Sequence, residues 1–310
     1  MWGVLKNLFS KDKKQEVNIR ERNIKRSKIS PLQKSIKRLE EREVKYVDTS
    51  LLSKNYKIKY QSLLNEEQIR ALLSTEGQYL VIAGAGSGKT RTIVYRTAWL
   101  IENGVAPEKI LMITFTRKAS EEMEERLKNI LGTNKLETTV TTFHSFCAKL
   151  IYKYKNLFEI QNLNILEDGE REKIIARIIA KLQLDKKFKG KFYSAEELSN
   201  KLEKLEIRKL KLDEIFEKEY IDDILAIKSE YKKYKKKNNL YEFEDLIDMV
   251  VKKFKENREF LTLIQKSIEY LVVDEYQDSN LSQRELLKLL IGADKNLMVV
   301  GDDYQSIYGF

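Results

Sequence analysis

The chain has 310 residues, enough for two domains, and 42% of them are hydrophobic, which supports buried cores. Its single cysteine, Cys147, excludes an internal disulfide and fits a reducing, cytoplasmic location. No apolar run approaches the roughly 20 residues that a membrane span requires, so we expect no membrane partner.

The positive charge of the chain is concentrated near its start. Residues 1–60 contain 17 Lys and Arg against 7 Asp and Glu, whereas residues 61–310 are balanced at 41 against 41. We therefore predict a basic N-terminal extension over residues 1–60, with an amphipathic helix within residues 29–44. Such a segment attracts polyanions such as nucleic acid, although a solvated basic tail explains the same charges at least as well.

From residue 61 onward, short apolar runs alternate with helical periodicity. We predict strands at 79–83, 109–116, 138–143, 270–274 and 297–301, and helices at 89–102 and 117–130. Residues 148–240 lose strand character, and the runs 196–211 and 228–237 favour helices. The pattern predicts an α/β fold, with a parallel sheet covered by helices on both faces and an inserted all-helical subdomain. The predicted domains are 61–147 and 241–310 for the α/β part and 148–240 for the insertion.

A glycine-rich turn follows the first predicted strand and opens the helix at 89–102. Its residues are Ala83, Gly84, Ala85, Gly86, Ser87, Gly88, Lys89 and Thr90. A phosphate chain requires converging backbone N–H groups at a helix start, and glycines allow the close approach. Lys89 can reach the β- and γ-phosphates, and the Thr90 hydroxyl can bind Mg²⁺. The pattern predicts ATP and Mg²⁺ as cofactors; a glycine-rich turn without a ligand is the weaker interpretation.

Two carboxylates stand at the end of the predicted strand 270–274. Asp274 is placed to hold Mg²⁺ through water, and Glu275 to orient or deprotonate an attacking water. Gln305 follows the last predicted strand and brings an amide to the same edge. Ligands of open α/β sheets collect at the carboxyl ends of the strands, so these side chains should converge there. Without the glycine-rich turn, an ordinary acidic strand end would explain Asp274 and Glu275 about as well.

Six segments in a fixed order carry a resemblance to a known family. Residues 64–68, 83–91, 114–119, 142–145, 273–278 and 301–310 resemble motifs Q, I, Ia, Ib, II and III of superfamily 1 helicases of the UvrD/Rep type. Within that family, residues 241–247 and Tyr304 are most similar to the helicase IV branch.

The resemblance implies roles for individual residues. Gln68 would recognise adenine, Arg91 would lie beside the nucleotide, and Gln277 and Gln305 would sense the γ-phosphate. Contacts to single-stranded DNA are implied for Phe115, Thr116, Arg117, His144, Tyr308 and Phe310. Of these, Phe115, Tyr308 and Phe310 would stack on bases, because every base offers a π-face. Core packing is the alternative for the aromatic residues, and a structural hydrogen bond is the alternative for His144.

The lysine-rich run at 228–237 has two interpretations. The helical insertion of the relatives contacts duplex DNA, which implies that these lysines touch duplex phosphates. A solvated helix face explains the same run slightly better.

The resemblance implies a motor that couples Mg-ATP hydrolysis to movement on single-stranded DNA or DNA junctions. The chain stops at Phe310 within motif III, so we expect a fragment that lacks a second motor domain and its arginines. Such a fragment would be monomeric or assembled with that domain, and would bind nucleotide weakly and hydrolyse it slowly. The alternatives are another P-loop NTPase, such as a nucleotide kinase or transporter ATPase, and a DNA-binding P-loop protein without unwinding activity.

Overall fold

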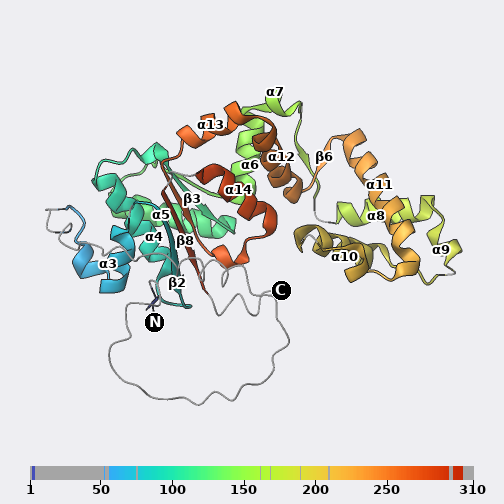
Figure 1. The fold of residues 1–310 in the computed structure, drawn as a ribbon, viewed down its shortest axis with the longest axis horizontal. Helices are drawn as coiled ribbons and strands as arrows, with labels where there is room; N and C mark the ends of the chain where they lie inside the picture. The colour runs from blue at the N-terminus through green and yellow to red at the C-terminus, as the bar shows by residue number, and fades with distance from the viewer. Residues whose placement is uncertain are drawn as a thin grey trace, which may run out of the picture. The chain divides into compact units, whose positions relative to one another are not determined.

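A computed structural model describes residues 2–3, 52, 56–74, 76–160, 162–167, 169–188, 190–208, 210–292 and 296–302. The chain, whose helices and strands are drawn in Figure 1, divides into two compact units. The sheet unit comprises residues 1–142, 262–279 and 290–310, and the helical unit comprises residues 143–261 and 280–289. The predicted helix at 29–44 and three predicted site residues, Gln305, Tyr308 and Phe310, lie outside the described residues.

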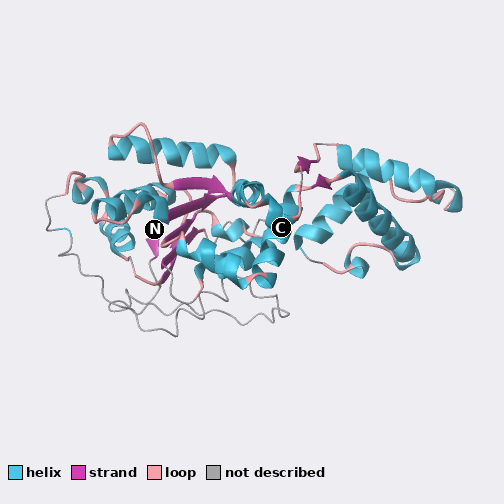
Figure 2. Ribbon diagram, turned by 90° about the horizontal axis from the view of Figure 1, so that it is seen from above, coloured by secondary structure: helices cyan, strands magenta, loops and turns pink. Residues whose placement is uncertain are grey.

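Six strands of the described residues form one sheet, drawn in magenta in Figure 2. In spatial order they are β1 (Trp2–Gly3), β2 (Gln78–Ala83), β8 (Asn296–Gly301), β7 (Tyr270–Val273), β3 (Ile110–Thr114) and β4 (Thr139–Thr142). The five strands from β2 to β4 are parallel, and β1 pairs antiparallel with β2. The predicted α/β class with a parallel sheet flanked by helices is confirmed. In this order the carboxyl ends of β2, β8 and β7 are adjacent.

Local sequence explains where the helices of the sheet unit begin and end. These helices are α2 (Tyr60–Leu63), α3 (Glu66–Leu73), α4 (Lys89–Glu102), η2 (Pro107–Lys109), α5 (Arg117–Leu131) and η5 (Tyr276–Asp278). α4 has the predicted bounds because Gly88 takes a left-handed conformation (φ 84°) directly before it. The predicted strand 109–116 is too long at its end, since Thr116 caps α5 by accepting a hydrogen bond from the Ala119 N–H at 3.1 Å. The predicted strand 138–143 ends at Thr142, and Phe143 begins α6.

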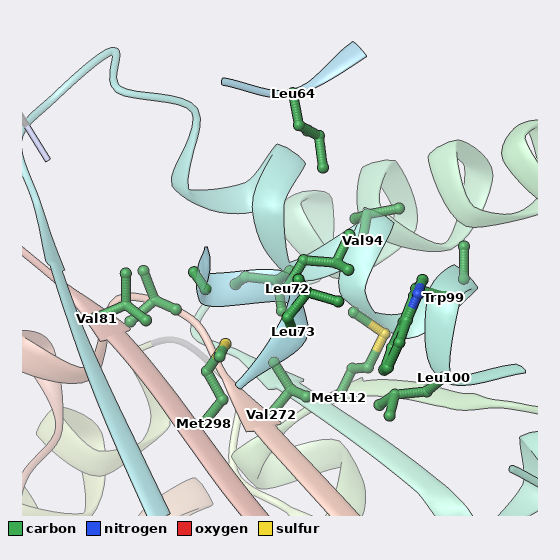
Figure 3. Close-up of a cluster of buried hydrophobic side chains, with 14 of the residues drawn as sticks. Leu64, Leu72, Leu73, Val81, Val94, Trp99, Leu100, Met112, Val272 and Met298 are labelled. Atoms are coloured by element: carbon green, nitrogen blue, oxygen red, sulfur yellow. The ribbon is translucent and has the colours of Figure 1, made fainter. Parts of the chain in front are cut away.

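One hydrophobic core lies between the sheet and helices α3, α4 and α5. Figure 3 shows Leu72 and Leu73 of α3, Trp99 and Leu100 of α4, and strand residues such as Val272 and Met298 packed together. Alternate strand residues that point the other way are also buried: Leu80, Leu111, Ile113, Leu271, Val273 and Val299. Both faces of the sheet are therefore covered, as expected for parallel strands.

A buried arginine connects α3 with α4. Arg96 is only 1% exposed, and its Nη1 donates to the carbonyl oxygens of Ala71 (3.2 Å) and Leu72 (3.1 Å) in the last turn of α3. Burial lowers the pKa of Arg96 to about 10. Its Nε has no hydrogen-bond partner among the described residues. The guanidinium thus satisfies carbonyl groups that a helix end leaves without intrahelical donors.

The helical unit contains helices and one short ladder. Its helices are α6 (Phe143–Lys153), α7 (Lys155–Phe158), α8 (Glu170–Lys181), α9 (Leu184–Lys187), α10 (Ala195–Arg208), η3 (Leu212–Glu214), η4 (Lys218–Tyr220), α11 (Ile221–Asn238) and α12 (Phe243–Glu256), with parts of α13 (Arg258–Lys266) and α14 (Leu281–Ile291). β5 (Asn164–Ile165) pairs in parallel with β6 (Leu240–Tyr241). A separate core that includes Ile175, Leu198 and Ile224 joins α8, α10 and α11. The predicted insertion at 148–240 falls within this unit, and its boundaries stay a prediction.

The lysine-rich run at 228–237 lies on α11. Lys235 is held between Glu242 (2.5 Å) and Asp245 (2.6 Å), and Lys233 pairs with Glu230 at 2.9 Å. Part of this run is therefore used in ion pairs within the unit. No helix in the described parts of the chain is long and apolar enough to cross a membrane.

Replacing Arg96 with methionine tests how much its hydrogen bonds stabilise the fold. Methionine keeps apolar length but offers no donor, so the carbonyls of Ala71 and Leu72 would stay buried without a partner. We expect the free energy of unfolding to fall by about 2–4 kcal/mol in urea titrations followed by circular dichroism. The matched control is Arg126→Met on α5, where a half-exposed arginine pairs with Glu122; it should change less than about 0.5 kcal/mol. Equal losses in the two variants would contradict the assigned role.

Candidate functional site

The glycine-rich turn joins β2 to α4 and presents an open backbone surface. Gly86 and Gly88 have left-handed φ angles of 74° and 84°, which non-glycine residues rarely adopt. The turn is closed by Ser87, whose backbone N–H (3.2 Å) and Oγ (2.6 Å) both donate to the Gly84 carbonyl. A Cβ atom added at Gly84 or Gly86 would meet nothing within 4 Å, so the turn has free space in front of it. This geometry fits an anion at the start of α4.

The Lys89 ammonium lies between two carboxylates. Its side chain is only 8% exposed, and its Nζ lies 3.5 Å from Glu275 Oε2 and 3.8 Å from Asp302 Oδ2. A buried cation requires such partners because desolvation is costly. Sequence reasoning missed Asp302, although it follows β8 directly, just as Asp274 follows β7.

Asp274 is buried beside the first turn of α4. Its Oδ2 accepts a hydrogen bond from Thr90 Oγ1 at 3.0 Å, and its Oδ1 accepts one from the Glu275 N–H at 3.0 Å. Burial raises the pKa of Asp274 to about 6, and the Glu275 charge adds to the rise, while Thr90, the Glu275 N–H and Lys89 oppose it. No group of three His, Cys, Asp or Glu among the described residues could hold a metal by itself. The oxygen atoms of Thr90 and Asp274 fit Mg²⁺, which normally completes its shell with water and phosphate oxygens.

Glu275 has a backbone conformation that is unusual for its residue type. Its φ and ψ are 49° and 41°, in the left-handed region. Gln277 Nε2 donates to Glu275 Oε2 at 2.7 Å, and Gln277 Oε1 accepts from the Asp302 N–H at 3.0 Å. Gln277 thus bridges the ends of β7 and β8. Strain of this kind in a non-glycine residue is common at functional sites.

Gly301 leaves room for this bridge. A Cβ atom at position 301 would lie 2.8 Å from Gln277 Oε1, closer than real Cβ contacts occur. Any side chain at 301 would therefore displace the Gln277 amide from the Asp302 N–H.

The Gln68 amide contacts the glycine-rich turn. Gln68 forms a reciprocal capping box with Asn65, in which its Oε1 accepts from the Asn65 N–H at 3.1 Å. Its Nε2 donates to the Ser87 carbonyl at 3.1 Å. Because an N–H and a carbonyl occupy its two sides, the orientation of the amide is fixed.

Arg91 is the third residue of α4 and connects it to the residues before α3. Its Nη2 donates to the Leu63 carbonyl at 2.8 Å, and its guanidinium lies 5.6 Å from the centre of the Tyr95 ring. Gln68 and Arg91 therefore both connect residues 63–68 to the glycine-rich turn and the start of α4.

Of the three residues after β3 that are predicted to contact nucleic acid, one is half-buried and two are exposed. Phe115 follows the strand and is half-buried, which differs from the predicted position within the strand. Thr116 is exposed and caps α5. Arg117 is exposed, with its Nε 2.9 Å from Glu121 Oε1.

In the helical unit, His144 lies beside an exposed aromatic residue. The His144 and Phe243 ring centres are 5.6 Å apart at an interplanar angle of 66°, and Phe243 is 56% exposed. His144 Nε2 lies 3.2 Å from Glu244 Oε1. Sequence reasoning did not assign Phe243 or Glu244 to a site, although both fall in the stretch 241–247 that resembles one branch of the family. Cys147 is fully buried.

Comparison with known proteins identifies relatives of the chain. Residues 64–310 match the family described as the UvrD/REP helicase N-terminal domain. A Staphylococcus aureus (strain Mu50) protein named ATP-dependent DNA helicase PcrA is 36% identical over 256 residues, which cover 80% of this chain and 34% of the relative. A protein of the same name from Staphylococcus epidermidis (strain RP62A) is 34% identical over 252 residues, with the same shares. The chain spans about a third of the length of these curated relatives.

The raised pKa of Asp274 predicts a pH-dependent stability in the metal-free chain. The folded chain keeps a proton on Asp274 up to about pH 6, whereas the unfolded chain loses it near the ordinary value of 3.8. Stability from this group is therefore fully present below about pH 3.8 and is lost as the pH rises from there to about 6. Asp274→Asn should raise the free energy of unfolding by about 1–3 kcal/mol at pH 8 and change it little at about pH 3.

Urea titrations at the two pH values, with EDTA present, measure this difference. Asp213→Asn removes an exposed carboxylate and serves as the control, with no stabilisation at either pH. An Asp274→Asn chain that is no more stable than wild type at pH 8 would contradict the assigned cause of the shift.

Proposed function

The chain belongs to the family of UvrD/REP helicase N-terminal domains, and from this we propose that it is the ATP-binding motor part of a DNA helicase. It would couple hydrolysis of Mg-ATP to movement along single-stranded DNA. The observation that carries this proposal is the convergence of Lys89, Thr90, Asp274, Glu275 and Gln277 at the ends of β2, β7 and β8. A phosphate cradle, a Mg²⁺-binding pair and a carboxylate base are the parts that phosphoryl transfer to water requires.

We propose that the turn at 83–90 binds the ATP phosphates. Its backbone N–H groups and the start of α4 attract the negative charge, and Lys89 contacts the β- and γ-phosphates. Thr90 and Asp274 would hold Mg²⁺, which neutralises charge on the phosphate oxygens. Lys89 must loosen its contacts with Glu275 (3.5 Å) and Asp302 (3.8 Å) to reach a phosphate.

We propose that Glu275 orients and deprotonates the attacking water. Its carboxylate is about one third exposed and is held in place by Gln277. Lys89 would neutralise this carboxylate until phosphate draws the ammonium away. Gln277, which also binds the Asp302 N–H, is placed to respond to the γ-phosphate, and the resemblance gives Gln305 a similar role.

For the base of the nucleotide, we propose recognition by Gln68 and stacking beside Arg91. The Gln68 amide keeps one N–H and one lone pair beyond its bonds to Asn65 and Ser87, which is the pair of groups that adenine can satisfy. The Arg91 guanidinium is a flat surface fixed by Leu63 and Tyr95.

Single-stranded DNA is the proposed track. The resemblance gives DNA contacts to Phe115, Thr116, Arg117, His144, Tyr308 and Phe310, and the exposed ring of Phe243 beside His144 adds a further stacking surface. The relatives are named DNA helicases, which favours DNA over RNA.

The resemblance assigns an arginine at the transferring phosphate to a second motor domain. For residues 1–310 assayed by themselves we therefore propose weak nucleotide binding and slow turnover. Without such an arginine, the rate of phosphoryl transfer typically falls by a factor of about 10³–10⁵.

Lys89→Ala should weaken nucleotide binding. Loss of the charged partner of the phosphates should weaken binding of a fluorescent ATP analogue with Mg²⁺ by roughly 30-fold to 100-fold in equilibrium titrations. Binding of oligo(dT) should remain. Lys128→Ala on α5, where a partly exposed lysine pairs with Glu124, is the matched control and should bind the analogue as wild type does. Normal binding by Lys89→Ala would exclude residues 83–90 as the phosphate site.

Glu275→Gln should separate binding from turnover. Glutamine keeps the size of the side chain and can still accept from Gln277, so nucleotide affinity should change less than about threefold. Single-turnover hydrolysis should fall by about 10²–10⁴, because the amide cannot take a proton from water. Hydrolysis at the wild-type rate would contradict the role of Glu275 as the base.

The same assays distinguish the other candidate functions. Oligo(dT) should accelerate phosphate release by the wild-type chain supplied with its second motor domain. A nucleotide kinase would instead transfer the phosphoryl group to a nucleoside monophosphate. A DNA-binding protein without motor function would bind oligo(dT) with no effect on hydrolysis.

A further inference from the structure

The helical unit presents an aromatic pair that we call the aromatic wall, consisting of His144 and Phe243. His144 is the second residue of α6, and Phe243 is the first residue of α12. The rings meet edge to face, and Phe243 leaves more than half of its surface in solvent. A single exposed aromatic residue is common on protein surfaces, but two rings in contact form a flat-sided surface to which a base can stack.

The orientation of the His144 ring depends on Glu244. The terminal torsion of a histidine is broad, so a half-exposed ring is oriented mainly by the hydrogen bonds that it makes. Glu244 Oε1 lies 3.2 Å from His144 Nε2. A carboxylate only accepts hydrogen bonds, so this contact selects the form of His144 with a proton on Nε2.

The other oxygen of the same carboxylate is anchored on α14. Glu244 Oε2 accepts a hydrogen bond from Asn280 Nδ2 at 3.1 Å. Asn280 is itself fixed by a reciprocal pair of bonds with Gln283: its Oδ1 accepts from the Gln283 N–H, and its N–H donates to Gln283 Oε1, both at 2.9 Å. Because the Asn280 oxygen faces an N–H, its Nδ2 is directed to Glu244. The carboxylate thus has a donor on each side.

We propose that Glu244 is a positioning residue for nucleic-acid binding, whose carboxylate orients the His144 ring of the aromatic wall and ties it to Asn280 at the start of α14. This inference rests on the proposed function, in which the aromatic wall stacks on single-stranded DNA. Asn280 follows Asp278 by two residues in the chain. The hydrogen bonds of Glu244 therefore connect the aromatic wall to a residue that closely follows the 274–278 segment in the chain.

Glu244→Gln tests the proposal because two physical effects predict opposite results. The substitution removes a negative charge, and general electrostatics then predicts tighter binding of a polyanion. A glutamine amide has one acceptor atom, so with the proton of His144 on Nε2 one of the two bonds, to His144 or to Asn280, is lost. We expect affinity for fluorescein-labelled oligo(dT) to fall by about threefold to tenfold in anisotropy titrations with residues 1–310.

Two further readouts distinguish positioning from a structural effect. Stacking carries little salt dependence, so the slope of log K against log salt should stay as in wild type while affinity falls at every salt concentration. Quenching of 2-aminopurine in an otherwise oligo(dT) strand should decrease at saturation. The thermal midpoint should remain within about 2 °C of wild type, because Glu244 is about one third exposed.

Matched variants complete the test. Glu256→Gln removes one exposed carboxylate from the same helix and should leave affinity unchanged or slightly higher. Asn280→Ser keeps a capping oxygen for α14 but loses the donor to Glu244, so it should weaken binding by about twofold to fivefold. This variant gives a second test if Glu244→Gln folds poorly.

The variants His144→Ala and Phe243→Ala separate failure of the inference from failure of the proposed function. Both should lose roughly tenfold in affinity. If they do so while Glu244→Gln and Asn280→Ser bind as tightly as wild type or more tightly, the positioning role of Glu244 is wrong. If neither alanine variant changes affinity, the aromatic wall does not bind nucleic acid, and the proposal is overturned with it.

Discussion

The buried ammonium of Lys89 constrains the whole candidate site. It lies at the start of α4 and contacts carboxylates that follow two different strands, Glu275 after β7 and Asp302 after β8. These contacts are possible only because β2, β8 and β7 are adjacent and parallel, so their carboxyl ends meet at one edge. A cation so little exposed would be strongly destabilising without them. A bound phosphate must therefore compete with Glu275 and Asp302 for the Lys89 ammonium. Nucleotide binding and the ion pair between Lys89 and Glu275 are therefore coupled.

The surrounding residues show that the site is arranged at some cost to stability. Asp274 carries a carboxylate in a buried place where its pKa is raised, and Glu275 holds a left-handed backbone conformation. Both features oppose folding, and both place an oxygen atom next to the glycine-rich turn. The polar bonds of Gln68, Arg91 and Arg96 compensate by joining residues 63–72 to the turn and to α4. Local strain at a site supported by a rigid scaffold is the usual pattern for catalysis.

Much of the sheet unit could be predicted from the sequence, because its signals are local. Apolar runs mark the parallel strands β2, β3, β7 and β8, and Gly88 fixes the start of α4. The predictions failed where a single side chain ended an element: Thr116 caps α5 and stops the strand early. Asp302, Asn280 and Glu244 were not identified as site residues because their partners are distant in the chain; Glu244 and His144 are 100 residues apart. The roles of Gln305, Tyr308 and Phe310 stay predictions, since these residues lie outside the described part of the chain.

Gly301 has a consequence for how sequences of this kind diverge. A buried strand such as β8 has room for many small side chains, yet an added methyl group at 301 would lie 2.8 Å from the Gln277 oxygen and displace it. A descendant with alanine at this position would keep the architecture, the glycine-rich turn and both acidic strand ends. It would lose only the bond that joins the ends of β7 and β8. Glycine at position 301 therefore indicates that a related sequence can form the hydrogen bond between Gln277 and the Asp302 N–H, and not only the same fold.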